Sequence, residues 1–244
     1  MTVTATGDVV GTVAALWRYP VKSTSAGEHV TRVHVSARGL DGDRLWAVRD
    51  GDGDGRLGSG KTTRRFRRTE GLLALVSSYD GDVPVLRFPD GRRLRGDDPA
   101  VHAALSAYAG RDVRLAVEDD VPHADEGPVH LVTTSTLRHL DAAHGAPVDA
   151  RHLRPNLLLD TPGSGLVEPG WVGRRLAVGV DLVVQVREPM PRCVMVTSAQ
   201  DRLDADPDLL RTVTDVADGE AGVVLDVVTP GEVAVGDEVR LADG

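Results

Sequence analysis

Cysteine, isoleucine, asparagine and lysine are rare or absent in this chain of 244 residues. It contains one cysteine, one asparagine, two lysines and no isoleucine, whereas valine and arginine are abundant. A single cysteine cannot form a disulfide within the chain, and it excludes a zinc ribbon or an iron–sulfur cluster held by thiolates of this chain alone. Redox chemistry would therefore require a cofactor or a partner protein that brings its own redox centre.

Long apolar runs and excess positive charge are also lacking. No segment approaches the roughly 20 apolar residues of a membrane-spanning helix, and the N-terminal sequence lacks the basic and apolar segments of a signal peptide. The 28 Lys and Arg residues face 37 Asp and Glu residues, which gives a net charge of -9. Because an acidic protein repels a phosphate backbone, we expect a cytoplasmic protein that binds neither nucleic acid nor membranes.

The few residues that survive this biased composition are informative. Scarce lysine, asparagine and isoleucine indicate pressure from a GC-rich genome, under which an ordinary surface cation drifts to arginine. A retained lysine therefore indicates a position that requires a compact ammonium group. Lys22, Lys61, Asn156 and Cys193 are the exceptions, and we take them as the first candidate functional residues.

Short valine-rich segments between Gly, Pro and Asp turns predict a mainly β fold with a few short helices and two β-barrel-like domains. An acidic stretch without apolar periodicity, 118–127, predicts a linker between a domain at 1–120 and a domain at 121–244. N-terminal caps and terminal glycines predict helices at 98–109, 134–144 and 207–216. The predicted strands are 9–19, 29–35, 45–49, 73–77, 83–88, 113–117, 130–133, 156–160, 175–178, 181–188, 222–228 and 238–241.

A basic, glycine-rich loop gives one misleading motif. Residues 55–62 (GRLGSGKT) satisfy the Walker A pattern, but the loop does not follow a buried strand directly, and the residues after Lys61 have no apolar face. A hairpin tip is the simpler interpretation, and a nucleotide-binding module is kept as a hypothesis. The basic run from Arg56 to Arg68 is either a solvated face or a loop that attracts an anionic ligand such as a phosphate ester.

The segment 187–197 (REPMPRCVMVT) is the strongest candidate for chemistry. A valine-rich strand runs into two prolines and then Cys193, and the neighbouring Arg192 favours the thiolate, the form that acts as a nucleophile or a metal ligand. No histidine forms a recognisable Cys–His signature, so ligation of a soft metal is favoured over covalent catalysis. A small, inert, buried thiol is the structural alternative.

Two further segments carry polar side chains beside strands. In 151–160 (RHLRPNLLLD), an amide can bind the edge of a heterocycle and an arginine can hold a phosphate. In 19–23 (YPVKS), a strand end bears Lys22 and a hydroxyl. Alone, Asn156 could cap a turn and Lys22 could be solvated, but their retention favours a function.

These motifs, in this order, resemble the MOSC family (molybdenum cofactor sulfurase C-terminal domain), in the two-domain arrangement of the mitochondrial amidoxime-reducing component and its bacterial relatives. LWRYPVKS and RGLDGDRLWAV look like the N-terminal β-barrel region, and RHLRPNLLLD, REPMPRCVMVT and GVVLDVVTPGEVAVGDEV look like the MOSC domain. The resemblance implies that Cys193 is the catalytic thiolate ligand of molybdenum. It also implies that Lys22, Ser23 and Arg44 hold the terminal phosphate of the cofactor, Arg154 and Asn156 hold the pterin, and Arg192 flanks the metal.

The resemblance implies a molybdenum-cofactor-dependent oxidoreductase that reduces N-hydroxylated or N-oxide substrates by oxygen-atom transfer. The cofactor would perform the redox step, and the protein would supply orientation and electrostatics. Electrons would come from a separate flavin or iron–sulfur protein, because this chain lacks the cysteines for a cluster. The alternative is a non-redox carrier of the molybdenum cofactor or of sulfur on Cys193. Pyridoxal phosphate binding, also associated with the family, is doubtful for this chain.

Overall fold

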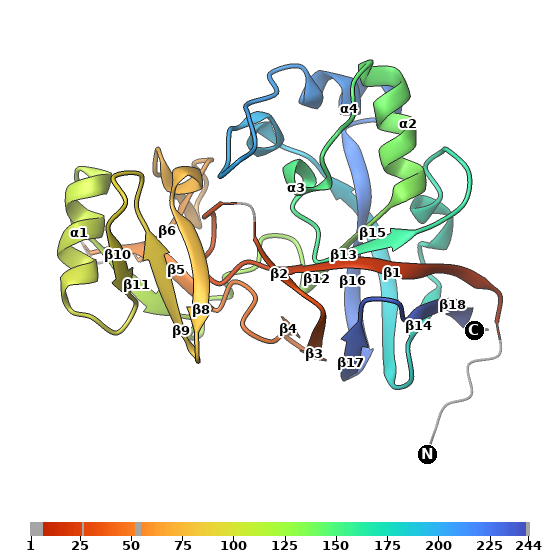
Figure 1. The fold of residues 1–244 in the computed structure, drawn as a ribbon, viewed down its shortest axis with the longest axis horizontal. Helices are drawn as coiled ribbons and strands as arrows, with labels where there is room; N and C mark the ends of the chain where they lie inside the picture. The colour runs from red at the N-terminus through yellow and green to blue at the C-terminus, as the bar shows by residue number, and fades with distance from the viewer. Residues whose placement is uncertain (1–6, 26, 52–54, 243–244) are drawn as a thin grey trace.

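The computed structural model describes residues 7–25, 27–51 and 55–242, and within them it contains eighteen strands and four α-helices. The predicted fold class, mainly β with a few short helices, is therefore confirmed. Figure 1 shows two lobes: a smaller one that carries α1 (Ala100–Ala109), and a larger one with α2 (Thr134–His144) and α4 (Leu209–Ala217) above a barrel. No helix in the described ranges is both long enough and apolar enough to span a membrane.

The larger lobe is built on a closed barrel of seven strands. Their order is β13, β12, β16, β15, β14, β18 and β1, and the antiparallel pair of β1 with β13 closes the ring. Among the described strand pairs of this ring, β12 with β13 is the only parallel one. Alternate side chains point inward and form an apolar core, as in a small barrel filled by its own side chains. The strands are β1 (Val9–Arg18), β12 (Val129–Thr133), β13 (Leu157–Asp160), β14 (Arg175–Val178), β15 (Leu182–Pro191), β16 (Glu220–Thr229) and β18 (Glu238–Ala242).

Segments from the start of the chain belong to this larger lobe. Strand β1 lies between β13 and β18, and β2 (Glu28–Val30) pairs with β1. Strand β3 (Arg32–Ser36) pairs with β4 (Gly39–Leu40) and with β17 (Gly231–Ala234). The division of the chain at residue 120 stays a prediction, but these pairings place strands from both sides of it in one lobe.

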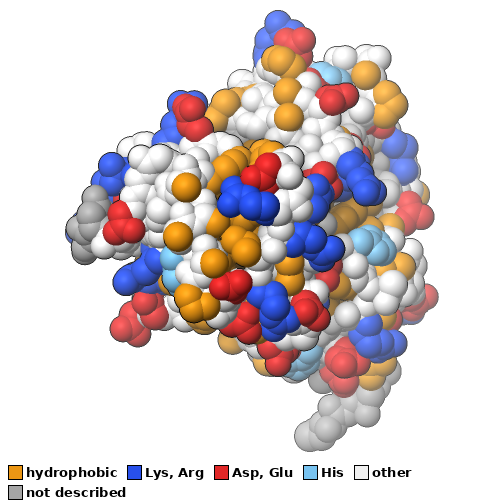
Figure 2. Space-filling view, turned by 60° about the vertical axis from the view of Figure 1, so that its left-hand side comes forward, with side chains coloured by type: hydrophobic (Ala, Val, Ile, Leu, Met, Phe, Trp, Pro, Cys, Tyr) orange, Lys and Arg blue, Asp and Glu red, His pale blue; other side chains and the backbone are white. Residues whose placement is uncertain are grey.

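The smaller lobe has two sheets that share a core with α1. One sheet orders β11 (Val113–Val117), β5 (Trp46–Asp50), β6 (Leu57–Ser59) and β7 (Phe66–Arg68), and the other orders β10 (Arg93–Arg95), β9 (Val83–Arg87) and β8 (Val76–Asp80). Leu75, Leu86 and Leu105 are buried between them. Figure 2 shows acidic and basic side chains interspersed over the face that it presents.

Most predicted elements are present, and one is wrong at its start. Helices α1 and α2 end at Gly110 and Gly145, which adopt left-handed φ angles of 66° and 79°. The predicted strand 73–77 begins instead with a 3₁₀-helix at Leu72–Ala74, and β8 starts at Val76. A short apolar run is compatible with a helical turn as well as with a strand, so the sequence pattern could not distinguish the two here. The short helix α3 (Ala150–Leu153) and the 3₁₀-helices Glu168–Trp171 and Val194–Thr197 were not predicted.

The predicted linker 118–127 has no regular structure, yet many bonds fix it. Arg38 Nε donates to Glu118 at 2.7 Å, and Arg49 Nη1 donates to Asp119 at 2.6 Å. Arg65 Nη2 donates to the Pro122 carbonyl at 2.6 Å. The linker is thus a fixed segment, and it passes the cavity described below.

Candidate cofactor site

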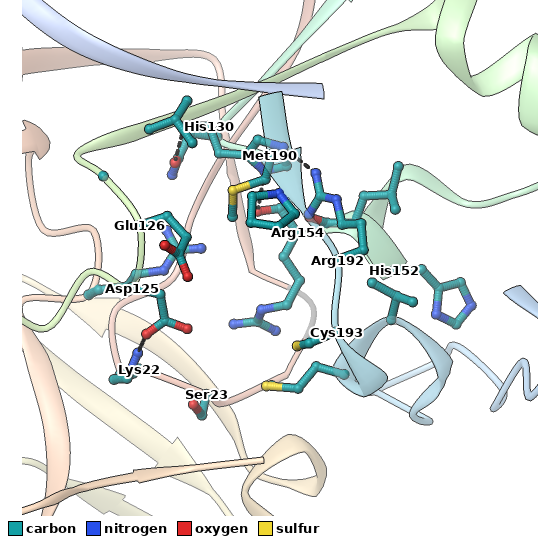
Figure 3. Close-up of a pocket in the computed structure, with 18 of the residues that line it drawn as sticks. Lys22, Ser23, Asp125, Glu126, His130, His152, Arg154, Met190, Arg192 and Cys193 are labelled. Carbon is teal, nitrogen blue, oxygen red and sulfur yellow. Dashed lines mark hydrogen bonds and ion pairs between the residues drawn. The ribbon is translucent and has the colours of Figure 1, made fainter. Parts of the chain in front are cut away.

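A cavity brings together every residue that the sequence proposed for the site. It is lined by all seven of them: Lys22, Ser23, Arg44, Arg154, Asn156, Arg192 and Cys193 (Figure 3). They lie after the C-terminal ends of β1 and β15, between β4 and β5, and between α3 and β13, and the fold brings these segments to one cavity. Their individual roles stay predictions. Lys61, which the composition singled out without assigning it a role in the site, also lines the cavity, as do Met190 and Met195, which were not predicted.

Cys193 stands at one end of this cavity, directly after β15. It precedes the 3₁₀-helix Val194–Thr197, and its thiol is free and partly exposed. Figure 3 shows its sulfur facing the cavity. Val196, which is 4% exposed, anchors this turn in the apolar cluster formed by α2 and α4. The thiol is therefore accessible on a turn that packing holds in place, and it is not the inert buried cysteine of the structural alternative.

Arg192 holds the end of β15 and so positions Cys193. Its Nε donates to the Ala221 carbonyl at 2.9 Å and its Nη1 donates to the Leu153 carbonyl at 2.8 Å, while Nη2 contacts His130 Nε2. Burial lowers the pKa of Arg192 to about 9, although the neighbouring Cys193 raises it. With these acceptors in place, Arg192 acts on the site mainly through the backbone that it fixes.

His130 is a site residue that the sequence analysis missed. Its Nε2 faces Arg192, and its Nδ1 lies 3.4 Å from the Arg154 carbonyl. Burial, followed by the charge of Arg192, holds the pKa of His130 well below its usual value. The ring is therefore neutral at pH 7, and these partners assign the proton to Nδ1, which donates to Arg154 while Nε2 accepts from Arg192. His130 is one of eight histidines in the chain and lies in a valine-rich strand, so nothing in the sequence indicates this role.

The other end of the cavity is cationic. Lys22 is only 3% exposed, and its Nζ pairs with Asp125 and lies 4.6 Å from the centroid of the Phe66 ring. Burial lowers the pKa of Lys22 to about 8, although Asp125 raises it. The Lys22 ammonium is therefore charged at pH 7, and it loses its proton far more easily than a solvated lysine does.

Two arginines share one aromatic ring beside this lysine. The guanidinium carbons of Arg44 and Arg154 lie 4.6 Å and 4.3 Å from the centroid of the Tyr19 ring. Arg154 Nη1 donates to the Thr24 carbonyl at 2.7 Å, and burial lowers the pKa of Arg154 to about 10. Stacking on the ring and hydrogen bonding hold both cations at the cavity wall.

Unusual backbone geometry coincides with the predicted site. Ser23, Arg44 and Arg154 have φ angles of 61°, 48° and 51°, and they are three of the five described non-glycine residues with positive φ. Each such residue costs about 1 kcal/mol or more, and such residues cluster where a site requires them. Their residue types disfavour this conformation, so the sequence alone could not show it.

Asn156 has a structural use that the sequence left open. Its Nδ2 donates to the Trp17 carbonyl at 3.2 Å, and its Oδ1 accepts from the His130 N–H at 3.1 Å. The side chain is 1% exposed and ties β1 to β12. Pterin recognition by Asn156 stays a prediction, and one N–H of the amide is left for it.

The acidic linker contributes two carboxylates that were not anticipated. Asp125 pairs with Lys22, and the Glu126 Oε1 atom lies 3.9 Å from Lys61 Nζ. Burial raises the pKa of Asp125, but the charge and hydrogen bond of Lys22, together with the charges of Lys61 and Arg44, outweigh burial and the net shift is downward. Consecutive acids of the linker thus face the only two lysines of the chain.

The donor set fits a ligand with an anionic end and a soft metal. A free thiol lines the cavity together with a buried lysine, a serine and three arginines, and Figure 3 shows Cys193 and Lys22 on opposite sides of it. Thiolates prefer soft metals, and fixed ammonium and guanidinium groups prefer phosphate esters. The residues present therefore fit a phosphorylated cofactor that carries such a metal.

Comparison with known families decides the classification. The model of the MOSC domain matches residues 118–240, and the model of the MOSC N-terminal beta barrel domain matches residues 10–106. The chain belongs to the MOSC family. MOSC domains are associated with binding of the molybdenum cofactor.

This MOSC chain is also similar to individual known proteins. The mitochondrial amidoxime reducing component 2 of Bos taurus is 26% identical over 237 residues, which cover 77% of this chain and 66% of that protein. The crystal structure of the YUAD protein from Bacillus subtilis superposes with a TM-score of 0.54 at 13% identity and covers 96% of both chains, so it shares the fold. YiiM from Escherichia coli gives a TM-score of 0.43 at 15% identity over 93% of this chain and 70% of its own.

Proposed function

We propose that this MOSC protein is a molybdenum-cofactor-dependent oxidoreductase that reduces N-hydroxylated or N-oxide compounds. The observation that carries the proposal is the single cavity with a free thiol at one end and fixed cations at the other. The name of the Bos taurus relative points to amidoximes as a substrate class. Reduction of an amidoxime breaks its N–O bond and consumes two electrons and two protons, and it yields an amidine and water.

Each end of the cavity would have its own task. Cys193 would provide the thiolate ligand of the metal, and Lys22, Ser23 and Arg44 would hold the terminal phosphate. Arg154 would face the pterin from its place on the Tyr19 ring. When bound, the molybdenum cofactor would supply the two-electron removal of oxygen from the N–O group.

The surrounding residues would keep this arrangement rigid. Arg192 and its partner His130 fix the backbone before the thiol, and Val196 anchors the turn after it, so Cys193 would need little reorganisation when it binds a metal. A separate flavin or iron–sulfur protein would deliver the electrons.

Quantifying molybdenum and pterin tests the proposal. Wild type, Cys193→Ser and the adjacent control Val194→Ala would be purified from a host that makes the cofactor, and each would be assayed with benzamidoxime and a chemical reductant. We expect about one molybdenum per chain and turnover in wild type and control, and loss of both in Cys193→Ser. Wild-type protein that contains neither molybdenum nor pterin would refute the proposal.

A non-redox carrier is the second candidate, and the partial exposure of the Cys193 thiol favours it because a carried group must be handed on. This function predicts a persulfide or a transferable cofactor on Cys193, with no reduction of any N-hydroxylated compound. Mass spectrometry of the intact protein, combined with the benzamidoxime assay, separates the two functions.

A further inference from the structure

The two lysines of the chain both reach the cavity, but they are bonded differently. Lys22 is buried and pairs with Asp125. Lys61 is 30% exposed, its Nζ lies 5.3 Å from the centroid of the Phe66 ring, and Glu126 is 3.9 Å away. In the described part of the chain the Lys61 ammonium has these two neighbours and no hydrogen bond. Its three donors therefore remain available to a ligand.

The backbone beside Lys61 approaches the thiol side of the cavity, while the Lys61 ammonium shares the Phe66 ring with Lys22. Lys61 follows Gly60, where a Cβ atom would come within 2.8 Å of Met195 Cγ and 3.0 Å of Met195 Sδ. Met195 is two residues beyond Cys193, and all three residues Lys61, Cys193 and Met195 line the cavity. A ligand bound in this cavity can therefore contact both the thiol and this ammonium.

Glu126 occupies the position that an anionic ligand would take. The distance from Glu126 Oε1 to Lys61 Nζ is longer than that of a hydrogen bond, and the side chain of Glu126 is 40% exposed. Exposed ion pairs of this kind contribute little to stability, so an incoming anion displaces the carboxylate easily. The main chain of the linker stays in place because Arg65 Nη2 donates to the carbonyls of Pro122 and Ala124 at 2.6 Å and 3.1 Å.

We propose that Lys61 forms an anion subsite at the mouth of the cavity, which takes a carboxylate or phosphate group carried by the substrate. Glu126 fills this subsite in the free protein. The inference rests on the proposed function, and it narrows the substrate class to N-hydroxylated compounds that bear a negative charge. It also explains the Walker-like loop: the loop runs from β6 into strand β7 and has no helix after Lys61, so it presents its lysine without forming a nucleotide-binding P-loop.

A matched pair of compounds tests the subsite. Binding and turnover of benzamidoxime and 4-carboxybenzamidoxime would be measured with wild type, Lys61→Ala and Glu126→Gln, all as purified from the cofactor-producing host. Arg68→Ala is the control, because it removes the same charge from the same loop at a side chain that is 66% exposed and does not line the cavity. Calorimetry gives the affinity whether or not turnover occurs.

Lys61→Ala is expected to weaken binding of 4-carboxybenzamidoxime about tenfold, as for loss of a charged hydrogen bond, and to leave benzamidoxime unchanged. Glu126→Gln is expected to strengthen binding of the charged compound, and Arg68→Ala to change neither. Equal weakening of both compounds, or an equal effect of Arg68→Ala, would overturn the proposal. Loss of molybdenum and pterin in Lys61→Ala would also overturn it, because the anion would then be the phosphate of the cofactor.

The outcomes separate this inference from the proposed function. Selective binding that depends on Lys61, without N–O reduction by molybdenum-loaded wild type, rejects the function and leaves the subsite. Turnover that does not distinguish the two compounds, and that Lys61→Ala does not change, rejects the subsite alone.

Discussion

Replacing Lys22 with methionine is expected to change how the stability of the protein depends on pH. The pKa of Lys22 is about 8 in the folded chain, against an ordinary value of 10.5 that applies after unfolding. Between these two pH values the unfolded chain holds the proton and the folded chain has lost it. The free energy of unfolding of the wild type therefore rises with pH in this window, because burial of the ammonium no longer opposes folding.

The size of the effect follows from the two pKa values. Because the pKa of Lys22 differs between the folded and unfolded chains, its titration raises the free energy of unfolding by about 2.5 kcal/mol between pH 7 and pH 10. Other groups that titrate in this range are present in both proteins, so they cancel in the difference between wild type and Lys22→Met. The difference is therefore expected to move by about 2.5 kcal/mol in favour of the wild type.

Urea unfolding, followed by circular dichroism at half-unit steps of pH, measures this difference. A difference that stays constant within about 0.5 kcal/mol would show that Lys22 titrates like a solvated lysine, and the argument from burial would fail. A second consequence can be measured by calorimetry. Because the ammonium is lost as the pH rises through 8, the affinity of the wild type for inorganic phosphate is expected to fall there, while its stability rises.

Three other changes have defined outcomes. Asp125→Asn removes the carboxylate that raises the pKa of Lys22, so the pKa of Lys22 is expected to fall further. The free energy of unfolding at pH 7 is expected to drop by about 1–3 kcal/mol, and an unchanged urea midpoint would contradict this loss of stability. His130→Leu removes an acceptor of the buried Arg192 and is expected to cost about 1–3 kcal/mol in the same assay, whereas a neutral result would mean that water replaces the ring. Gly39→Ala places a Cβ against a backbone carbonyl at a φ of 110°, so a loss of about 2 kcal/mol or more is expected in thermal unfolding, and full stability would refute the close approach.

Local patterns were sufficient for most strands and for the helix ends. Valine-rich segments and glycine stops are local signals, and Gly110 and Gly145 end their helices as expected. The closure of the barrel was not predictable in this way, because β1 joins β13 and β18 across most of the chain. Pairing between such distant segments leaves no mark in either segment alone.

The site was predictable where composition singled residues out, and less so elsewhere. Both scarce lysines, Asn156 and Cys193 line one cavity, although Asn156 makes its hydrogen bonds to strand backbone. The neutral ring of His130 depends on partners far away in sequence. Asp125 belongs to a segment whose composition is that of an ordinary linker, so its contact with Lys22 had no signal.

The closed barrel constrains how the protein is made. Val9 of β1 pairs with Arg240 of β18, so the ring cannot close until both strands have been synthesised. Until then a long apolar strand near the N-terminus has unpaired edges, which is the condition under which nascent chains stick to one another. Closure of this lobe is therefore governed by contacts of very high sequence separation, and such a topology folds slowly.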